Sequence, residues 1–368
     1  MPVTVRLAAA SLPYEGAFRL HTATSGRVDA LHELYLFVER GDGLTGIGEV
    51  RANATYANGL PEESVPGLIR ELVEALDWSD APTGALAALP ETAAVTPPLA
   101  RAAVESALVE MAAREADRCV AEVLGGRFEP SLPSNQCLFW SDDDGAFLAQ
   151  AEGFISEGFR DLKMRVGVAG HDRDLARLAM LRERFGDAVR LSVDANGSWT
   201  AAQALDFLDR AAPYRLDYVE QPTTIGDWDA FVRVGREGAV PPMLDEGLKT
   251  VADVARLVSL GPPFLAHLKV SKMGGPMAVV ASARALAEAG VGFMVGQMNE
   301  GALATALTVH CAMAAQPLHR ELYGCYGLSR DPARGVSYRD GRACVPSGPG
   351  LGIGVDRRAL EPLWEIVR

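Results

Sequence analysis

The chain has 368 residues, of which 48% are hydrophobic and 23% charged, and it carries a formal net charge of −13. This composition predicts a globular protein with a large core, and the negative charge argues against nucleic acid or an anionic membrane as a partner. No stretch is long and apolar enough for a transmembrane helix or a signal-peptide core. The five cysteines are scattered, with no Cys-x-x-Cys pair, which favours a reducing compartment, so we expect a cytoplasmic protein.

The first 126 residues predict a mixed α+β domain. Residues 3–12 and 30–40 alternate apolar and polar side chains as antiparallel strands do, and residues 41–50 add a third strand after a tight turn. Two helices follow, over residues 61–76 and 97–123, and the second ends at a pair of glycines.

From about Ser131 the pattern changes to alternating strands and helices, which is typical of a parallel sheet. Strands are expected near residues 133–139, 160–166, 189–194, 217–220, 241–245, 264–270, 291–297 and 319–323. Eight such repeats imply an α/β fold closed into a TIM barrel, which we place at residues 127–329. The turn-rich residues 330–368 are expected to return to the first domain.

Three acidic residues follow apolar runs at nearly equal intervals in the chain. Asp194, Glu220 and Asp245 are separated by 26 and 25 residues, and a further 24 residues reach Lys269. One strand, one helix and two loops of a β/α barrel occupy about this length, so the four side chains are expected at the same rim. Converging carboxylates need a cation to stay ionised together. We therefore predict a metal site, and oxygen ligands favour Mg²⁺, with Mn²⁺ as a possible substitute.

Two cationic residues lie on the second predicted barrel strand. Lys163 and Arg165 are two residues apart, so their side chains are expected to point to the same face. If that face is the interior, they lie roughly opposite Lys269, with the metal between them. This layout suits removal of a proton next to a carboxylate, because a dication stabilises the developing charge. A lysine acts as the base only when its ammonium is destabilised.

Structural interpretations compete with the catalytic ones. A single aspartate after a strand is more often a helix cap or turn residue, although four such residues at one-repeat spacing argue against coincidence. The six histidines show no ligand spacing, and His267 is expected to be a buried core residue. The glycine-rich segment near residue 350 does not lie between a strand and a helix, so a nucleotide-binding loop is not expected.

At these residues the chain resembles the enolase superfamily, and specifically its muconate lactonizing enzyme subgroup. The motifs that carry the resemblance occur in order along almost the whole chain: EVLGG, the Lys-x-Lys-like strand at 160–167, SVDANGSW, YVEQP, LDEG, HLKVSKMGG, GQMNEGALATA and PSGPGLGIGVD. The mandelate racemase subgroup, which has a histidine on its seventh strand, fits less well.

The resemblance implies a capping domain over a modified (β/α)7β barrel. It implies that Asp194, Glu220 and Asp245 bind Mg²⁺. It also implies that Lys269 is a general acid/base acting through an enediolate intermediate.

The resemblance further implies that two loops of the capping domain, about residues 14–27 and 51–60, set the substrate specificity. Tyr56 lies in the second loop, and Glu300 matches an acidic position of the subgroup near the substrate carboxylate. Trp140, near the end of the first barrel strand, either lines the pocket or packs against it. We take these three as candidate substrate-binding residues.

Arg165 departs from the family pattern, because it replaces the second lysine of the Lys-x-Lys motif, the usual second base. Arginine does not lose its proton in proteins, so racemisation with one base on each face is in doubt. Lys163 matches the first lysine, which normally gives electrostatic support.

Four functions remain open from the sequence. The chain resembles isomerases that racemise, epimerise or cycloisomerise a small carboxylate such as an amino-acid derivative. A dehydratase with Lys269 as its main base is the alternative that Arg165 favours. A Schiff-base aldolase with Lys269 as the nucleophile and a non-catalytic metal-binding homologue are the remaining ones. Members of the family often form dimers or octamers, so we expect a homo-oligomer.

Overall fold

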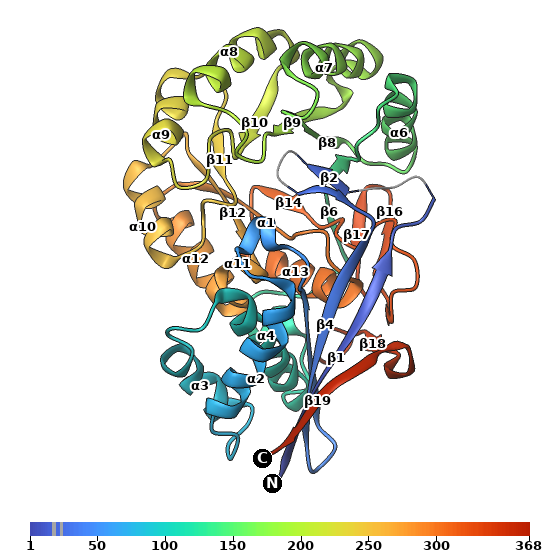
Figure 1. The fold of residues 1–368 in the computed structure, drawn as a ribbon, viewed down its shortest axis with the longest axis vertical. Coiled ribbons are helices and arrows are strands. Elements are labelled where there is room, and N and C mark those ends of the chain that lie inside the picture. The colour runs from blue at the N-terminus through green and yellow to red at the C-terminus, as the bar shows by residue number, and fades with distance from the viewer. Residues whose placement is uncertain (17–19, 23–24) are drawn as a thin grey trace.

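The computed structural model describes residues 1–16, 20–22 and 25–368, and it contains a barrel above a smaller capping domain (Figure 1). The capping domain contains a four-stranded antiparallel sheet in the order β19-β1-β4-β5. Its strands are β1 Val3–Pro13, β4 Ala30–Arg40, β5 Thr45–Arg51 and β19 Glu361–Val367. The three predicted N-terminal strands are confirmed. The last strand of the chain pairs with the first, so both termini lie at the same end of the molecule.

Five helices accompany this sheet. They are α1 Thr55–Asn58, α2 Val65–Ala75, α3 Thr83–Thr92, α4 Pro98–Glu115 and α5 Val120–Val123. The predicted helix over 97–123 was wrong in its length, because Asp117 adopts a left-handed backbone (φ 51°) and the amide of Arg118 bonds back to the carbonyl of Ala113. Helix α3 was not predicted, and Pro90 lies inside it.

Helix α4 connects the two halves of the molecule, because it packs against β5 on one side and against two barrel helices on another, α11 Val270–Met273 and α12 Pro276–Glu288. Gly46 and Gly48 permit the first contact. A Cβ at Gly48 would lie 2.2 Å from the carbonyl oxygen of Ala103, and one at Gly46 would lie 2.0 Å from that of Ala107. The strand backbone therefore rests directly on the helix backbone.

The barrel contains eight neighbouring strands in chain order, from β7 to β14, joined by parallel pairing. They are β7 Gln136–Leu138, β8 Asp161–Arg165, β9 Arg190–Asp194, β10 Leu216–Glu220, β11 Pro242–Leu244, β12 Leu265–Lys269, β13 Gly292–Gly296 and β14 His319–Glu321. All eight predicted strands are confirmed. The amide of Asn135 bonds to the carbonyl of Arg320 at 2.9 Å, which draws the first and last strands together.

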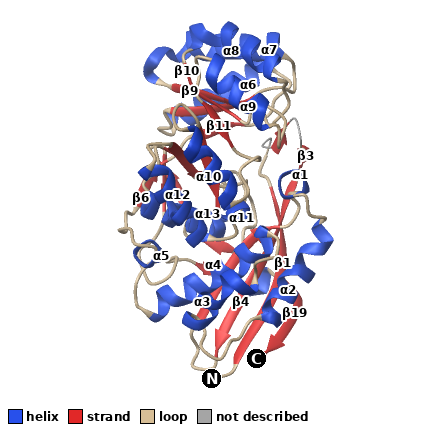
Figure 2. Cartoon of the chain, turned by 90° about the vertical axis from the view of Figure 1, so that its left-hand side faces the viewer, coloured by secondary structure: helices blue, strands red, loops and turns tan. Residues whose placement is uncertain are grey.

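Helices surround these strands on the outside, as Figure 2 shows. They are α6 Asp144–Ser156, α7 His171–Phe185, α8 Ala201–Ala211, α9 Trp228–Glu237, α10 Val251–Leu260, α11 Val270–Met273, α12 Pro276–Glu288 and α13 Ala302–Ala315. Helices follow each of the first seven strands, and among the described residues β14 has no α-helix after it. The fold is thus a (β/α)7β barrel with an α+β capping domain, as expected.

Short strands complete the structure. They are β2 Leu20–Thr22, β3 Gly26–Val28, β6 Ser131–Pro133, β15 Ala333–Arg334, β16 Ser337–Arg339, β17 Arg342–Cys344 and β18 Gly354–Val355. The tail therefore does more than return to the capping sheet. Its strand β17 also pairs with β6, the strand that directly precedes the first barrel strand in the chain. The domain boundaries at residues 126 and 330 stay predictions.

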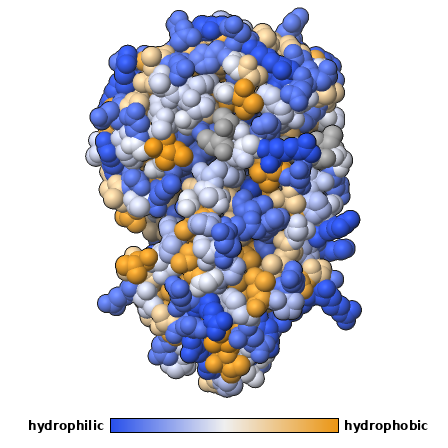
Figure 3. Space-filling view, viewed as in Figure 1, coloured by the Kyte–Doolittle hydropathy of each residue, from blue (hydrophilic) through white to orange (hydrophobic). Residues whose placement is uncertain are grey.

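The surface is mainly hydrophilic, with hydrophobic residues in small separate groups on the face that Figure 3 shows. No helix in the described part of the chain is long and apolar enough to cross a membrane.

Two carboxylates join the capping domain and its C-terminal tail to the barrel at the start of α13. Glu49 of β5 accepts a hydrogen bond from the amide of Ala304 at 2.6 Å, and Asp331 accepts one from the amide of Ala302 at 2.7 Å. Both accept hydrogen bonds from amides of the first turn, which have no partner within the helix. Gly301 makes room for Glu49, since a Cβ there would lie 2.0 Å from its Oε1.

Replacing Gly48 by alanine should destabilise the protein by about 1–3 kcal/mol, because the new methyl group has no space at the backbone of α4. The matched control is Gly67→Ala on α2, where a Cβ has no neighbour within 4 Å. That change should be neutral or stabilise by up to about 1 kcal/mol. Chemical unfolding of both variants measures the difference, and equal stabilities would contradict the packing described for β5.

His310 makes stability depend on pH. Its Nδ1 accepts the amide of Ala121 at 3.1 Å, and burial lowers the pKa of its ring to about 4. The unfolded chain binds a proton at this histidine more readily than the folded chain does. The contribution of His310 to the free energy of unfolding is therefore present above about pH 6.5 and is lost as pH falls toward about 4.

We expect His310→Asn, which keeps an acceptor near the Nδ1 position, to lose less stability over this range than the native protein. The difference should reach at most about 3 kcal/mol. Urea unfolding at several pH values measures it, and parallel stability curves for the two proteins would contradict the assignment.

Candidate active site

The predicted acids and lysine meet at the C-terminal ends of four neighbouring strands. Asp194 ends β9, Glu220 ends β10, Asp245 directly follows β11 and Lys269 ends β12. All four are at most 4% exposed. The turns after the strands hold them in place: Asn196 donates to both oxygens of Asp194, through its amide at 2.9 Å and its side chain at 3.0 Å.

Gln221 connects two of these strand ends. Its Oε1 accepts the amides of Asp245 at 3.1 Å and Gly247 at 3.0 Å, while its Nε2 donates to the carbonyl of Thr223 at 2.9 Å. Its backbone is in the left-handed region (φ 34°). The side chain thus fixes the loop that carries Asp245 relative to the loop after Glu220.

Lys163 lies among three carboxylates inside the barrel. Its ammonium donates to Glu220 at 2.8 Å, pairs with Glu321 and lies 3.9 Å from Asp194. Burial lowers the pKa of Lys163, but the carboxylates of Glu220 and Glu321 outweigh burial and leave that pKa well above its ordinary value. The side chain is only 2% exposed, so its charge is neutralised by protein groups rather than by water.

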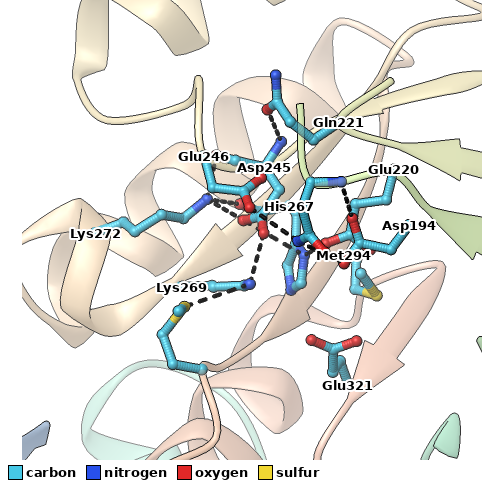
Figure 4. Close-up of polar contacts among 12 residues, drawn as sticks. Asp194, Glu220, Gln221, Asp245, Glu246, His267, Lys269, Lys272, Met294 and Glu321 are labelled. Atoms are coloured by element: carbon cyan, nitrogen blue, oxygen red, sulfur yellow. Dashed lines mark hydrogen bonds and ion pairs between the residues drawn. The ribbon is translucent and has the colours of Figure 1, made fainter. Parts of the chain in front are cut away.

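Asp245 lies between two lysines, as Figure 4 shows. Lys269 donates to its Oδ2 at 2.7 Å, and Lys272 donates to its Oδ1 and to its backbone carbonyl. Burial raises the pKa of Asp245, but Lys269 and Lys272 outweigh burial and hold it well below its usual range. In turn, burial lowers the pKa of Lys269, and Asp245 outweighs burial so that the pKa is raised.

His267 is buried, as expected, but it is also part of the site. Its Nδ1 lies 2.8 Å from Glu220 and 3.7 Å from Asp245, and its ring is 0% exposed. Burial, followed by the charge of Lys269, holds the pKa of the ring well below its usual range, so the imidazole is neutral. Gly296 of β13 gives it room, since a Cβ there would lie 2.3 Å from Nε2.

These residues fit a divalent cation. Donor atoms of Glu220, Asp245 and His267 all lie within 4.8 Å of one another, and among the described residues they form the cluster with metal-ligand potential. Asp194 is not part of that cluster, although it ends the strand next to β10 and pairs in register with Glu220. Burial, and then the charge of Glu220, raises the pKa of Asp194 well above its usual value. A dication relieves such repulsion, and carboxylate oxygens suit Mg²⁺ or Mn²⁺.

A small cavity of about 30 Å³ opens at Asp245 of this cluster. Tyr56 and Thr22 of the capping domain line it together with Lys163, Arg165 and Lys269. Its remaining walls come from strand ends and loops of the barrel: Asp194, Asn196, Asp245, Glu246, Gln297, Met298, Asn299, Glu321 and Tyr323. Residues 17–19 and 23–24 of the predicted first specificity loop lie outside the described residues.

Arg165 reaches the cavity with unused hydrogen-bond donors. Its Nη2 donates to Asn299 over a long 3.4 Å, while its buried Nε and Nη1 have no hydrogen-bond partner among the described residues. A buried donor without a partner is costly. The guanidinium is therefore suited to an anionic group that enters the cavity.

Two predicted substrate-binding residues do not line this cavity. Trp140 bonds to Asp142 at 3.2 Å, and its ring lies 5.4 Å from that of His21 and 5.3 Å from the Arg177 guanidinium. Glu300 lines a small neighbouring cavity of about 20 Å³, where burial raises its pKa to about 7. Their roles in binding stay predictions.

Sequence reasoning missed Glu321, Lys272 and Glu246. Glu321 ends a strand that was predicted, so the rule that selected the other acids could have found it. Glu246 follows Asp245, and Asn196 donates to it at 3.0 Å. Lys272 gave no separate signal, because its contact with Asp245 depends on the short helix α11.

The comparisons with known proteins agree with this geometry. The family described as Enolase C-terminal domain-like matches residues 146–359. The chain is 29% identical to muconate cycloisomerase 1 of Pseudomonas putida over 327 residues, 87% of each chain. It belongs to the enolase superfamily, in the muconate lactonizing enzyme subgroup. Enolase-superfamily relatives also include L-Ala-D/L-Glu epimerase of Bacillus subtilis, 30% identical over 69% of this chain and 70% of the relative.

Solved structures of the superfamily extend the likeness to the whole chain. The crystal structure of N-succinyl Arg/Lys racemase from Bacillus cereus superposes with a TM-score of 0.91 at 25% identity and covers 100% of both chains. These three relatives are a cycloisomerase, an epimerase and a racemase, which supports isomerase activity for this superfamily member.

Asp194→Asn should weaken binding of Mg²⁺ more than about 100-fold, since even outer partners of metal ligands typically contribute 10–100-fold. Isothermal titration of metal-free protein with Mg²⁺ measures the change, and Asp209→Asn on the exposed face of α8 is the control. Equal affinities in the two variants would show that Glu220, Asp245 and His267 hold the ion without Asp194.

Proposed function

We propose that this protein is a metal-dependent isomerase that transfers the proton on the carbon next to the carboxylate of a small substrate. The observation that carries the proposal is the arrangement around the cavity. Lys269 on β12 and the pair Lys163 and Arg165 on β8 line the same cavity from strands on opposite sides of the barrel, and the acids lie between them.

The metal site contributes charge. Mg²⁺, or Mn²⁺ in its place, when held by Asp194, Glu220 and Asp245, would stabilise the negative charge that a carboxylate gains as its α-proton leaves. Lys269 is placed to take and return that proton, because its ammonium lies at the cavity and 2.7 Å from Asp245. It acts as a base only when the charge of Asp245, which favours its protonated form, is compensated.

Arg165 limits the proton transfer to one face of the substrate. A guanidinium does not lose its proton in proteins, and the ion pairs of Lys163 with Glu220 and Glu321 hold that ammonium in place. We infer that Lys269 is the single base, and that Arg165 binds the substrate carboxylate through Nε and Nη1. This favours a cycloisomerase-type reaction over racemisation, which needs a base on each face.

One-base chemistry equally suits a second candidate, the elimination of water from a β-hydroxy acid. The same residues serve it, because Lys269 removes the α-proton and the hydroxyl leaves from the neighbouring carbon. The aldolase alternative would require a covalent bond between substrate and Lys269, which borohydride would trap in metal-free protein. The expected homo-oligomer and the cytoplasmic location stay predictions.

The experiment that tests the proposal is α-proton exchange in D₂O with Mg²⁺, followed by proton NMR. The panel contains N-acyl amino acids, dipeptides, proline analogues, sugar acids and unsaturated diacids. We expect exchange into one epimer only, with the carbon skeleton retained or cyclised. Loss of water would assign the dehydratase, and exchange into both epimers would refute the single-base assignment.

Lys269→Ala should reduce the exchange rate by at least about 10²–10⁴-fold, the usual contribution of a positioned base, while Mg²⁺ still binds. Lys249→Ala, on the loop after β11, is the matched control and should exchange at the native rate. An exchange rate in Lys269→Ala equal to that of the control would rule out Lys269 as the base.

A further inference from the structure

A second polar cavity, of about 250 Å³, lies at the opposite end of the barrel from the active site. Its walls come from the N-terminal ends of β8, β9 and β14 and from the turn between β16 and β17. The proposed reaction uses none of its residues.

The cavity is cationic in an anionic protein. Four arginines line it against two aspartates, which gives a formal local charge of +2, whereas the whole chain carries −13. The arginines are Arg160, Arg190, Arg320 and Arg342.

Ordinary ion pairing does not account for three of these four arginines. Arg190 pairs with Asp161 at 2.7 Å. Arg160 instead donates to the carbonyl oxygens of Ile155 and Phe159, and Arg342 donates to Ser131. Within residues 1–16, 20–22 and 25–368, Arg160, Arg320 and Arg342 form no ion pair with a carboxylate within 4.0 Å.

Three buried polar atoms of residues that line the cavity have no hydrogen-bond partner in the part of the chain that the structure describes. They are Nδ1 of His319, Nε of Arg320 and Oδ1 of Asp161, and His319 and Asp161 are each 8% exposed. Because buried polar groups are normally hydrogen-bonded, these atoms indicate a polar occupant. Two nitrogen atoms and one carboxylate oxygen, from residues that line the same cavity, suit an occupant that accepts hydrogen bonds and also donates one.

The surroundings of His319 are positively charged as well. Burial, and then the charges of Arg190 and Arg320, lower the pKa of its ring to about 4. Its ring also packs at 4.8 Å from that of Tyr218 inside the barrel, which fixes its orientation.

We propose that the cavity where Arg160, Arg320 and Arg342 meet His319 and Asp161 is a binding site for a small oxyanion that carries a hydroxyl group. Hydrogen phosphate and hydroxycarboxylates share this chemistry. Arginine nitrogens bind the oxyanion through charge-assisted hydrogen bonds, and Oδ1 of Asp161 accepts a hydrogen bond from the hydroxyl group. The site is separate from the proposed reaction and does not depend on it.

The test is isothermal titration of the full chain with sodium phosphate, in the presence of a chelator and at constant ionic strength. A parallel titration with malate distinguishes an inorganic from an organic hydroxy-anion. Arg320→Gln removes the buried donor, and Arg160→Gln at the exposed rim is a second variant that does not disturb the interior. Arg358→Gln, on an exposed turn, is the matched control, and Arg165→Gln removes an active-site arginine.

We expect saturable binding to the native protein and to the Arg358→Gln and Arg165→Gln variants, and at least tenfold weaker binding to Arg320→Gln and Arg160→Gln. Tighter binding of malate than of phosphate would assign an organic ligand, and the reverse an inorganic one. The proposal is overturned if neither anion binds saturably. It is also overturned if Arg165→Gln abolishes binding while Arg320→Gln and Arg160→Gln retain it, since the anion then occupies the active site.

Discussion

Burial of opposite charges at the end of the barrel is the constraint on which the site depends. Lys163 shares its ammonium among carboxylates from three other strands, and Asp245 takes hydrogen bonds from Lys269 and Lys272. Removing one member of such a cluster leaves a buried charge without a partner, which costs several kcal/mol. The strands and their loops therefore have to hold each charged group at a short distance from its partner. A bound dication would add charge to this cluster and change the balance among its members.

The capping domain completes the site rather than merely covering it. Arg51 at the end of β5 donates to the carbonyl oxygen of Asn299 and to the hydroxyl of Tyr56, each at a distance of 3.4 Å. Asn299 in turn accepts from Arg165. The loop after β13 is thus held from the capping domain and from the barrel at once, and the position of Arg165 depends on both.

The sequence predicted what depends on local pattern and repeat length. The eight barrel strands and the convergence of Asp194, Glu220, Asp245 and Lys269 follow from apolar runs of regular spacing, and these are properties of the chain alone. The partner of Lys163 on β14 and the contact of His267 with Glu220 depend on which side chains meet across the barrel. Spacing along the chain carries no such information.

The remaining differences arise from backbone conformation and side-chain direction. The end of α4 depends on the left-handed conformation at Asp117, which a non-glycine residue signals weakly. Glu300 follows β13, and its side chain lines the neighbouring cavity rather than the one at Lys269. Trp140 follows the first barrel strand as expected, and its ring packs with His21 and Arg177.

The contact of Glu49 with α13 bears on how this architecture can be recombined. Helix α13 receives part of its N-terminal cap from another domain, and the missing Cβ of Gly301 leaves space for that carboxylate. In a chimaera that takes its capping domain from a relative and its barrel from this chain, the capping carboxylate and the helix that it caps therefore come from different proteins. Such a hybrid should assemble well only when the donor domain supplies an acid of matching length at the position of Glu49.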